Sequence, residues 1–138
     1  MAQVIGKLMT PDPVVLPADT PVVDAARAMR DRGIGMVVVE TDAGVGILTD
    51  RDIVLRAVAG GDDADTGRIG SICSQDIVTI APESDVEEAV TLMRERAVRR
   101  LVVTDDGTPV GVVSLGDLAQ ERDPHSALGG ISRAEPNR

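Results

Sequence analysis

The sequence predicts an α+β fold made of two tandem β-α-β-β-α repeats that pack sheet to sheet about a pseudo-two-fold axis. The main observation is an internal repeat: residues 28–39 read AMRDRGIGMVVV, and residues 92–103 read LMRERAVRRLVV. In addition, VGILTDRDI at 45–53 matches VGVVSLGDL at 110–118. The offset there grows by one residue, so we expect a longer hairpin loop in the second copy. Because one copy is too small to bury its sheet alone, the two are expected to pack together and to leave two equivalent clefts.

The first copy contains every element of the unit in order. Thr20 is the predicted N-cap of its first helix, with Pro21 in the first helical position, and Gly33 is expected to end that helix in the left-handed conformation. Hydrophobic periodicity and turn residues predict a strand, a helix, the two strands of a hairpin and a second helix, at residues 14–16, 21–32, 36–39, 45–48 and 50–59.

The second copy repeats this order. Its first helix is predicted to begin with a capping box from Ser84 to Glu87, and its hairpin to turn at Asp105-Asp106-Gly107. Residues without hydrophobic periodicity follow the second copy and are expected to form a mobile tail. The predicted boundaries are therefore a first copy at 4–59, a linker at 60–67, a second copy at 68–122 and a tail at 123–138.

The composition narrows the range of functions. The chain has no Phe, Trp or Tyr, so any planar ligand must lie between aliphatic side chains. A formal net charge of −9 repels phosphate backbones and opposes nucleic-acid binding. The single cysteine, Cys73, excludes an internal disulfide and fits a reducing compartment. With no signal peptide and no apolar run of roughly 18 residues, we expect a cytoplasmic protein that has no membrane partner.

The most informative motif occurs once in each copy, as GILTDRD at 46–52 and GVVSLGD at 111–117. Each has a strand end, a hydroxyl residue, two variable residues and an aspartate at the start of a helix. One interpretation is a capping box, in which the hydroxyl caps the helix and the carboxylate lies in its first turn. Another is a ribose site, in which the carboxylate accepts hydrogen bonds from a vicinal diol. The two interpretations are compatible.

Two copies of this motif, each preceded by a hairpin and an M-R-x-R helix, resemble the CBS domain family over roughly residues 4–122. Leu8-Met9-Thr10-Pro11 is similar to the usual start of a CBS repeat, whereas Ile72-Cys73-Ser74 departs from it. Val38 and Val102 stand where the family usually has proline. The resemblance implies a tandem CBS pair, or Bateman module: a non-catalytic regulatory, energy-sensing module that binds AMP, ADP or ATP in its clefts. It also implies a disc-like homodimer that regulates a partner protein which the sequence does not identify.

The resemblance also implies which residues contact the ligand. In both copies the hydroxyl residue and the aspartate of the motif would hold the ribose and the nearby phosphate. The backbone of the first strand would border the adenine. The residues carried over are Thr49, Asp52, Ser114 and Asp117 for ribose and phosphate, and Val14, Val15, Val78 and Thr79 for adenine.

Three arginines are candidates for phosphate binding. Arg99 and Arg100 follow the first helix of the second copy, where CBS repeats often have a phosphate-binding basic residue. The alternative is a solvated pair of arginines at the start of a strand. Arg51 lies inside the first motif, and Gly116 takes its place in the second. Because of these differences the two sites cannot be chemically equal, and the cleft that receives Arg99 should prefer the more highly charged ligand.

The remaining candidates favour structural roles. Cys73 takes the place of Met9 in the repeat and is expected to be a small buried residue. Met29 and Met93 lie on apolar helix faces and are expected in the core. His125 falls in the predicted tail, where neither a metal nor a catalytic role is expected.

Two other functional classes have weaker support. An enzyme is not expected because the sequence has no Ser/His/Asp set, no Cys/His pair and no His/Cys ligand cluster. We therefore expect no catalytic residue, no metal site and no catalytic cofactor. A stress-type interaction protein that acts through a dimer surface, without a nucleotide, would have the same fold. Titration with AMP and ATP separates it from a nucleotide sensor.

Overall fold

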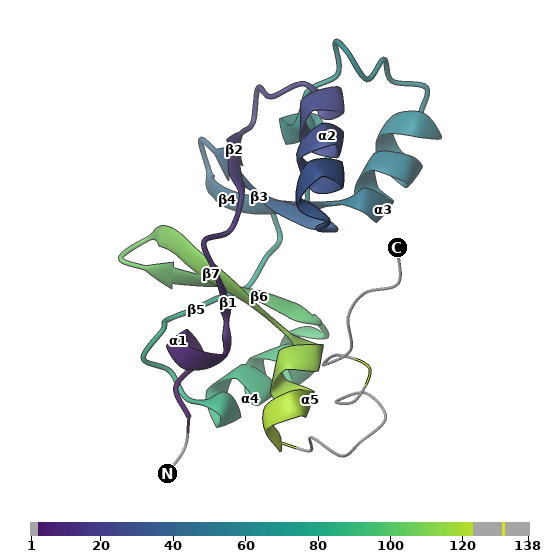
Figure 1. The fold of residues 1–138 in the computed structure, drawn as a ribbon. Helices are drawn as coiled ribbons and strands as arrows, with labels where there is room; N and C mark the ends of the chain where they lie inside the picture. Colours follow the sequence, from purple (N-terminus) through teal and green to yellow (C-terminus); the bar gives the residue numbers. More distant parts are fainter. Residues whose placement is uncertain (1–2, 123–130, 132–138) are drawn as a thin grey trace. The chain divides into compact units, whose positions relative to one another are not determined.

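The computed structural model describes residues 3–122 and 131, and it divides them into two compact units (Figure 1). One unit consists of residues 13–77, and the other of residues 3–12 together with residues 78–122. These folded units cut across the copies found in the sequence, because each copy contributes its opening segment to the other copy's unit. The mixed α+β class with two sheets is as predicted.

The unit of residues 13–77 is a three-stranded sheet with its helices. Its strands are in the order β2-β3-β4, with β2 parallel and β4 antiparallel to β3. The predicted second helix is present, but only its first three residues are α-helical. The rest is a π-helix, in which the amide of Ala59 donates to the carbonyl of Val54 at 2.9 Å. The elements are β2 (Val15–Pro17), α2 (Val22–Arg32), β3 (Met36–Thr41), β4 (Gly44–Thr49), α3 (Asp50–Asp52), the π-helix Ile53–Val58 and a 3₁₀ turn at Ile69–Ser71.

The core of this unit is aliphatic. Val22, Ala25 and Met29 recur on one face of α2 and pack against alternate strand residues. Residues from the opening of the second copy complete the cluster. The other members are Val37, Val39, Leu48, Ala57, Ile69, Ile72 and Cys73.

The first turn of α2 is capped by backbone carbonyls of residues 64 and 67 and not by Thr20. The helix begins at Val22 with Pro21 as its N-cap residue, and no side chain caps it. Instead, the amide of Val22 donates to the carbonyl of Gly67, and that of Val23 to the carbonyl of Ala64, both at 2.9 Å. The prediction for Thr20 is therefore wrong, since backbone carbonyls satisfy the free amides. Gly33 ends the helix at φ 63° and ψ 39°, as predicted.

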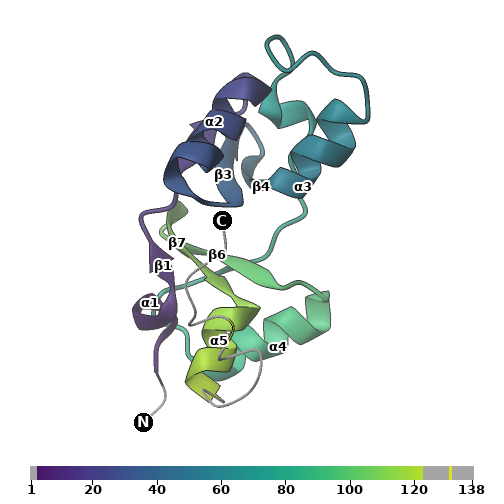
Figure 2. The same ribbon diagram turned by 45° about the vertical axis from the view of Figure 1, so that its right-hand side comes forward.

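The other unit is a four-stranded sheet in the order β1-β7-β6-β5. Figures 1 and 2 show α4 and α5 on the same face of this sheet, with the N-terminal α1 and β1 beside β7. Its core contains Ile5 from α1, three residues of α4, strand residues and Leu118 of α5. The elements are α1 (Ile5–Leu8), β1 (Thr10–Pro11), β5 (Thr79–Ile80), α4 (Val86–Arg96), β6 (Arg100–Asp105), β7 (Thr108–Ser114) and α5 (Leu115–Arg122).

Two details of this unit differ from the sequence prediction. The cap of α4 is Asp85, whose Oδ1 accepts the amide of Glu88 at 2.9 Å, so the capping box from Ser84 to Glu87 is wrong by one residue. Both hairpin loops have the same length, so the longer loop is also wrong. The extra residue is Val110, a bulge in β7 between the pairs Val103↔Gly111 and Thr104↔Pro109.

Each opening segment that lies in the other copy's unit, here called an exchanged segment, is held there by backbone hydrogen bonds of an Ile-Gly pair. This pair occurs in both copies. The amides of Ile69 and Gly70 donate to the carbonyls of Thr20 and Ala18 at 3.0 and 2.9 Å. A Cβ on Gly70 would lie 2.8 Å from the Cβ of Ala18, so only glycine permits this approach. The amides of Ile5 and Gly6 make the equivalent bonds, to the carbonyls of Ser84 and Pro82 at 2.8 and 2.9 Å.

The expected tail at 123–138 and His125 lie outside the described residues, apart from Ile131. Within residues 3–122, no helix is long and apolar enough to cross a bilayer.

Candidate functional site

The first motif forms a complete capping box at the end of β4. The amide of Asp52 donates to Oγ1 of Thr49 at 3.1 Å, and the amide of Thr49 donates to Oδ2 of Asp52 at 2.9 Å. The second motif repeats this geometry at the end of β7. The amide of Asp117 donates to Oγ of Ser114 at 3.2 Å, and the amide of Ser114 donates to Oδ2 of Asp117 at 2.8 Å. The capping interpretation is therefore confirmed in both copies.

The cap uses only one oxygen of each carboxylate. Oδ1 of Asp52 lies 3.8 Å from Nε of Arg56, which is too long for a hydrogen bond. Among the side chains that the structure describes, Oδ1 of Asp117 has no hydrogen-bond or ion-pair partner. Both aspartates are half-buried and held in one orientation by the cap. Each therefore presents one oriented oxygen that can accept a hydroxyl hydrogen, as a sugar diol requires.

In each unit a backbone hydrogen bond joins the motif to the residue that precedes β3 or β6. The amide of Asp50 donates to the carbonyl of Gly35 at 3.0 Å, and the amide of Leu115 donates to the carbonyl of Arg99 at 2.9 Å. Arg100 is the cross-strand partner of Ser114, so their side chains lie on the same face of the sheet. In the other unit the matched partners are Met36 and Thr49. A basic residue therefore lies beside the second motif where the first motif has a methionine.

The candidate arginines are all exposed. Arg99 and Arg100 belong to the unit of the second motif, and Arg51 lies in α3 beside Asp52. The backbone amide of Arg51 donates to Oδ1 of Asp50 at 2.8 Å, so an acidic group lies next to this arginine. The arginine of the first motif therefore has an acidic side chain beside it, whereas the second motif has two arginines, Arg99 and Arg100, at the start of the adjacent strand β6.

The predicted adenine-bordering residues lie at the start of the parallel strand pairs β2–β3 and β5–β6. The carbonyl of Val14 accepts the amide of Val38 at 2.8 Å, and the carbonyl of Val78 accepts the amide of Val102 at 3.2 Å. Val15 and Thr79 are the first residues of β2 and β5, respectively. Val14, Val15 and Val78 are half-buried, and Thr79 is exposed. The fold thus places Val14 and Val15 in the unit of Asp52, and Val78 and Thr79 in the unit of Asp117.

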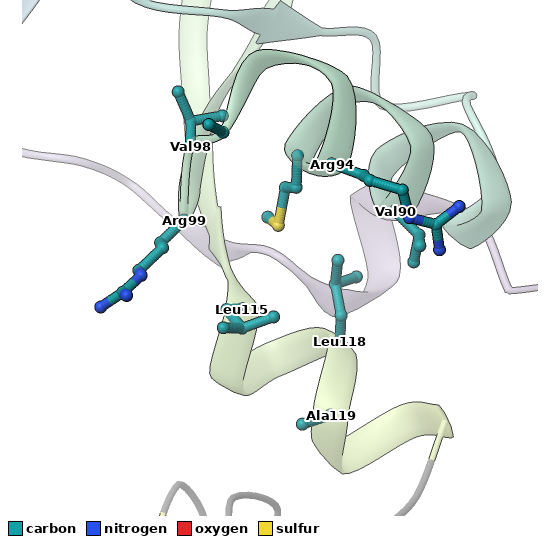
Figure 3. A pocket seen from close by; sticks show the side chains of 9 residues that line it. Val90, Arg94, Val98, Arg99, Leu115, Leu118 and Ala119 are labelled. Carbon is teal, nitrogen blue, oxygen red and sulfur yellow. The ribbon is translucent and has the colours of Figure 1, made fainter.

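Sequence reasoning missed a pocket of about 640 Å³ between α4 and α5. Figure 3 shows Leu118 of α5 pointing toward α4, while the side chain of Arg99 points away from the pocket. Leu115, where the first copy has Asp50, is the sequence signal that could have indicated it. The pocket is lined by Val90, Met93, Arg94, Ala97, Val98, Arg99, Leu115, Leu118 and Ala119.

Arg56 is a second residue that sequence reasoning did not select. Its Nη1 donates to the carbonyl of Ile72 at 3.1 Å, while its Nε faces Oδ1 of Asp52. Its position four residues after Asp52 on a helix is the signal that could have found it.

The residues expected to have structural roles are buried. Met29 and Met93 are buried in the two cores, and Cys73 is a free, buried cysteine. Burial raises the pKa of the Cys73 thiol above its ordinary value; the nearby Asp52 carboxylate adds to the rise, and Arg56 opposes it. Within the described part of the chain, no group of three or more His, Cys, Asp or Glu side chains could hold a metal ion.

Comparison with known proteins gives the family. The family model for the CBS domain matches residues 5–58 and again residues 69–123. The chain belongs to the CBS domain family. The two matches make it a tandem CBS pair, and CBS domains are in general regulatory modules.

Two curated relatives show how far the similarity extends. The CBS domain-containing protein YhcV of Bacillus subtilis is 35% identical over 130 residues, which cover 94% of this chain and 91% of that protein. An uncharacterized protein of Methanopyrus kandleri, MK0525, is 35% identical over 119 residues, or 84% of this chain. That match spans only 61% of the Methanopyrus protein.

Solved structures share the fold. Hypoxic Response Protein I, solved with two coordinated zinc ions, superposes with a TM-score of 0.74 at 28% identity, covering 86% of this chain and 98% of that one. The CBS domain pair of protein MJ0100, solved with 5′-methylthioadenosine and S-adenosyl-L-methionine, has a TM-score of 0.72 at 20% identity. That match covers 88% of this chain and 96% of the other. At that identity the second likeness shows the fold alone.

Proposed function

We propose that this CBS pair is a non-catalytic regulatory module that binds an adenosine-containing ligand of the AMP, ADP or ATP class. The observation that carries the proposal is the matched geometry of Thr49 with Asp52 and of Ser114 with Asp117. A capping box needs one carboxylate oxygen, and both copies leave the second oxygen oriented and available. A ribose diol offers the hydroxyl donors that such an oxygen accepts.

We assign the phosphate of the ligand to the arginines and its adenine to the aliphatic residues. Arg99 and Arg100 would bind phosphate near the second motif, and Arg51 near the first. A guanidinium group binds phosphate oxygens through paired hydrogen bonds. The backbones of Val14 with Val15 and of Val78 with Thr79 would border the adenine, which would lie against aliphatic side chains because the chain has no aromatic residue.

The comparisons support the class of ligand. The MJ0100 pair, which shares the fold, was solved with two adenosine-containing molecules. This supports the ability of the fold to accommodate adenosine, while the choice among AMP, ADP and ATP rests on the arginines. We place the module in the cytoplasm because its single cysteine is free. Through its response to the ligand it would regulate a separate protein.

A second candidate is an interaction protein that acts through a dimer surface with no nucleotide. It is favoured by Val54, Leu55 and Val58 on the π-helix, which are 56%, 51% and 68% exposed. Neighbouring exposed apolar side chains of this kind mark interaction surfaces. We propose that they contribute to a homodimer under either function. Light scattering at micromolar concentration tests this, and a mass of one chain would contradict it.

Mass spectrometry of the small molecules released from the purified, denatured protein separates the two functions. The nucleotide proposal expects an adenosine-containing mass that is absent from protein carrying Asp52→Ala and Asp117→Ala together. A protein that releases no such molecule, and is not stabilised by millimolar AMP, ADP or ATP, would favour the interaction protein.

A further inference from the structure

We infer that Arg56 is a positioning residue that couples the ligand-binding carboxylate of Asp52 to the opening segment of the second repeat, Ile69–Cys73. The inference rests on the proposed function, since Asp52 is assigned there to the ligand. It names a link between a bound ligand and a segment that belongs to the other repeat in sequence. Neither the motif nor the family match assigns a role to this arginine.

The contacts of Arg56 are made by two different nitrogens of one guanidinium group. Nη1 donates to the carbonyl of Ile72 at 3.1 Å, a contact between residues sixteen positions apart. Nε faces Oδ1 of Asp52 at 3.8 Å. Ile72 is buried, and its segment supplies three residues to the core of the unit. The planar fork of the guanidinium fixes the direction of both contacts at once.

The distance to Asp52 suits a positioning role. Oδ2 of Asp52 is occupied by the amide of Thr49, and Oδ1 faces a cation that is too distant to take up its lone pairs. The carboxylate is therefore held in one orientation, with Oδ1 still able to accept ligand hydroxyl groups. The Arg56 side chain is 51% exposed, and an ion pair so exposed contributes little to stability.

Within the described residues, the second repeat has no arginine equivalent to Arg56. The residue four positions after Asp117 is Glu121, which is exposed and carries the opposite charge. Among the described side chains, no cation lies within ion-pair distance of Asp117. The two motifs share their capping geometry but differ in this coupling, so only the ligand at Asp52 is expected to affect the docking of an opening segment.

Cys73 provides a direct readout of that docking. It is the single cysteine of the chain, it follows Ile72, and it is buried against Gly46 of β4. A maleimide or disulfide reagent can therefore reach the thiol only when the segment loosens. Because Arg56 also acts on the pKa of this thiol, labelling is followed over a range of pH, which separates a change in thiolate fraction from a change in exposure. The rate of labelling then reports the position of Ile69–Cys73 without requiring any activity.

The test compares Arg56→Ala, Arg56→Lys and Arg27→Ala in the full chain, with circular dichroism as the folding control. Arg27 is an exposed helix arginine of the same unit, so its variant controls for loss of a charge. Without ligand, Arg56→Ala should label about fivefold faster than the parent, and Arg27→Ala at the parental rate. Arg56→Lys keeps the charge but loses the fork, so it should lie between them; it also replaces Arg56→Ala if that variant does not fold.

Titration with AMP supplies the second arm. In Arg56→Ala the affinity of the Asp52 site should fall about fivefold, and AMP should protect Cys73 less than in the parent. Parental labelling and parental affinity in Arg56→Ala would overturn the inference. If Asp52→Ala weakens binding and Arg56→Ala does not, the proposed function stands and this inference fails. If the parent binds no adenosine compound, the proposed function fails. In that case, unchanged labelling of Cys73 in Arg56→Ala would overturn the role of Arg56 in holding the Ile69–Cys73 segment, and faster labelling would support that role.

Discussion

Thr49 and Asp52 are joined by two reciprocal hydrogen bonds, and Ser114 and Asp117 repeat this relationship within 0.1 Å at both bonds. Two different hydroxyl residues thus give the same geometry at the same place in each repeat. A cap of this kind stabilises the start of a helix and also fixes one carboxylate oxygen toward the backbone. The remaining oxygen is presented in one orientation, so a structural motif and a ligand site can use the same aspartate.

Removing either aspartate should leave the protein folded but less stable. Asp52→Ala and Asp117→Ala should each lower the free energy of unfolding by about 0.3–1 kcal/mol, since each loses a first-turn carboxylate while the hydroxyl cap stays in place. Urea denaturation followed by circular dichroism measures this. Asp85→Ala, which removes the N-cap side chain of α4, is a control for loss of a helix-end carboxylate; it should lower the free energy of unfolding by about 0.5–2 kcal/mol without any effect on ligand binding. A loss of more than 4 kcal/mol would show that the aspartates have a larger structural role.

The arginines beside the second motif should discriminate by phosphate. Arg100 is the cross-strand partner of Ser114, and the carbonyl of Arg99 accepts the amide of Leu115. Arg99→Ala and Arg100→Ala together should lower the affinity for AMP or ATP by about ten- to hundredfold. The affinity for adenosine should stay almost unchanged, because adenosine has no phosphate. Calorimetric titration with each compound measures the difference. An equal loss for adenosine would point to a general disturbance of the site.

The Ile-Gly pairs predict a difference between two glycine variants. Gly70→Ala would bring a Cβ to 2.8 Å from the Cβ of Ala18 and to 2.9 Å from its carbonyl oxygen. It should destabilise the protein by about 1–3 kcal/mol. Gly6→Ala meets Pro82 at 3.3 Å and should cost less. Chemical denaturation of both variants tests the exchanged segments, and a Gly70→Ala protein as stable as the parent would contradict this packing.

Cys73 should make the protein less stable at alkaline pH. Burial raises the pKa of this thiol in the folded state, so above the ordinary thiol pKa the unfolded chain has lost a proton that the folded chain keeps. The contribution is fully present below the unfolded pKa and is lost as the pH rises through the folded pKa. Cys73→Ala should remove this part of the pH dependence, as measured by urea midpoints from pH 7 to 10. The same alkaline slope in the parent and the variant would contradict the assignment.

Local signals in the sequence predicted local structure well. Gly33 was identified because a helix ends readily at a left-handed glycine, and Asp105-Asp106-Gly107 because Asp106 and Gly107 suit positive φ values of 52° and 82°. The capping boxes at Asp52 and Asp117 were also visible, since a hydroxyl residue three positions before an aspartate is a local pattern. The ligand assignments remain predictions.

The sequence predictions that were wrong depend on contacts between distant residues or on patterns that fit two local structures. The cap of α2 comes from the carbonyls of Ala64 and Gly67, which no local pattern around Thr20 can indicate. Ser84 and Asp85 are adjacent residues that can both cap, and only the backbone decides between them. An alignment of the two copies shows one extra residue but not its register, so it does not distinguish a bulge at Val110 from a longer loop. A repeat also has the same sequence pattern whether or not its opening segments are exchanged.

The measurement that tests the central claim most directly is titration of AMP into four proteins: the parent, Asp52→Ala, Asp117→Ala and the double variant. Each single variant should weaken one class of site by roughly ten- to hundredfold and leave the other at the parental affinity, and the folded double variant should lose both. If both single variants and the double variant stay folded and bind AMP as the parent does, the two motifs are helix caps only, and the assigned site is wrong.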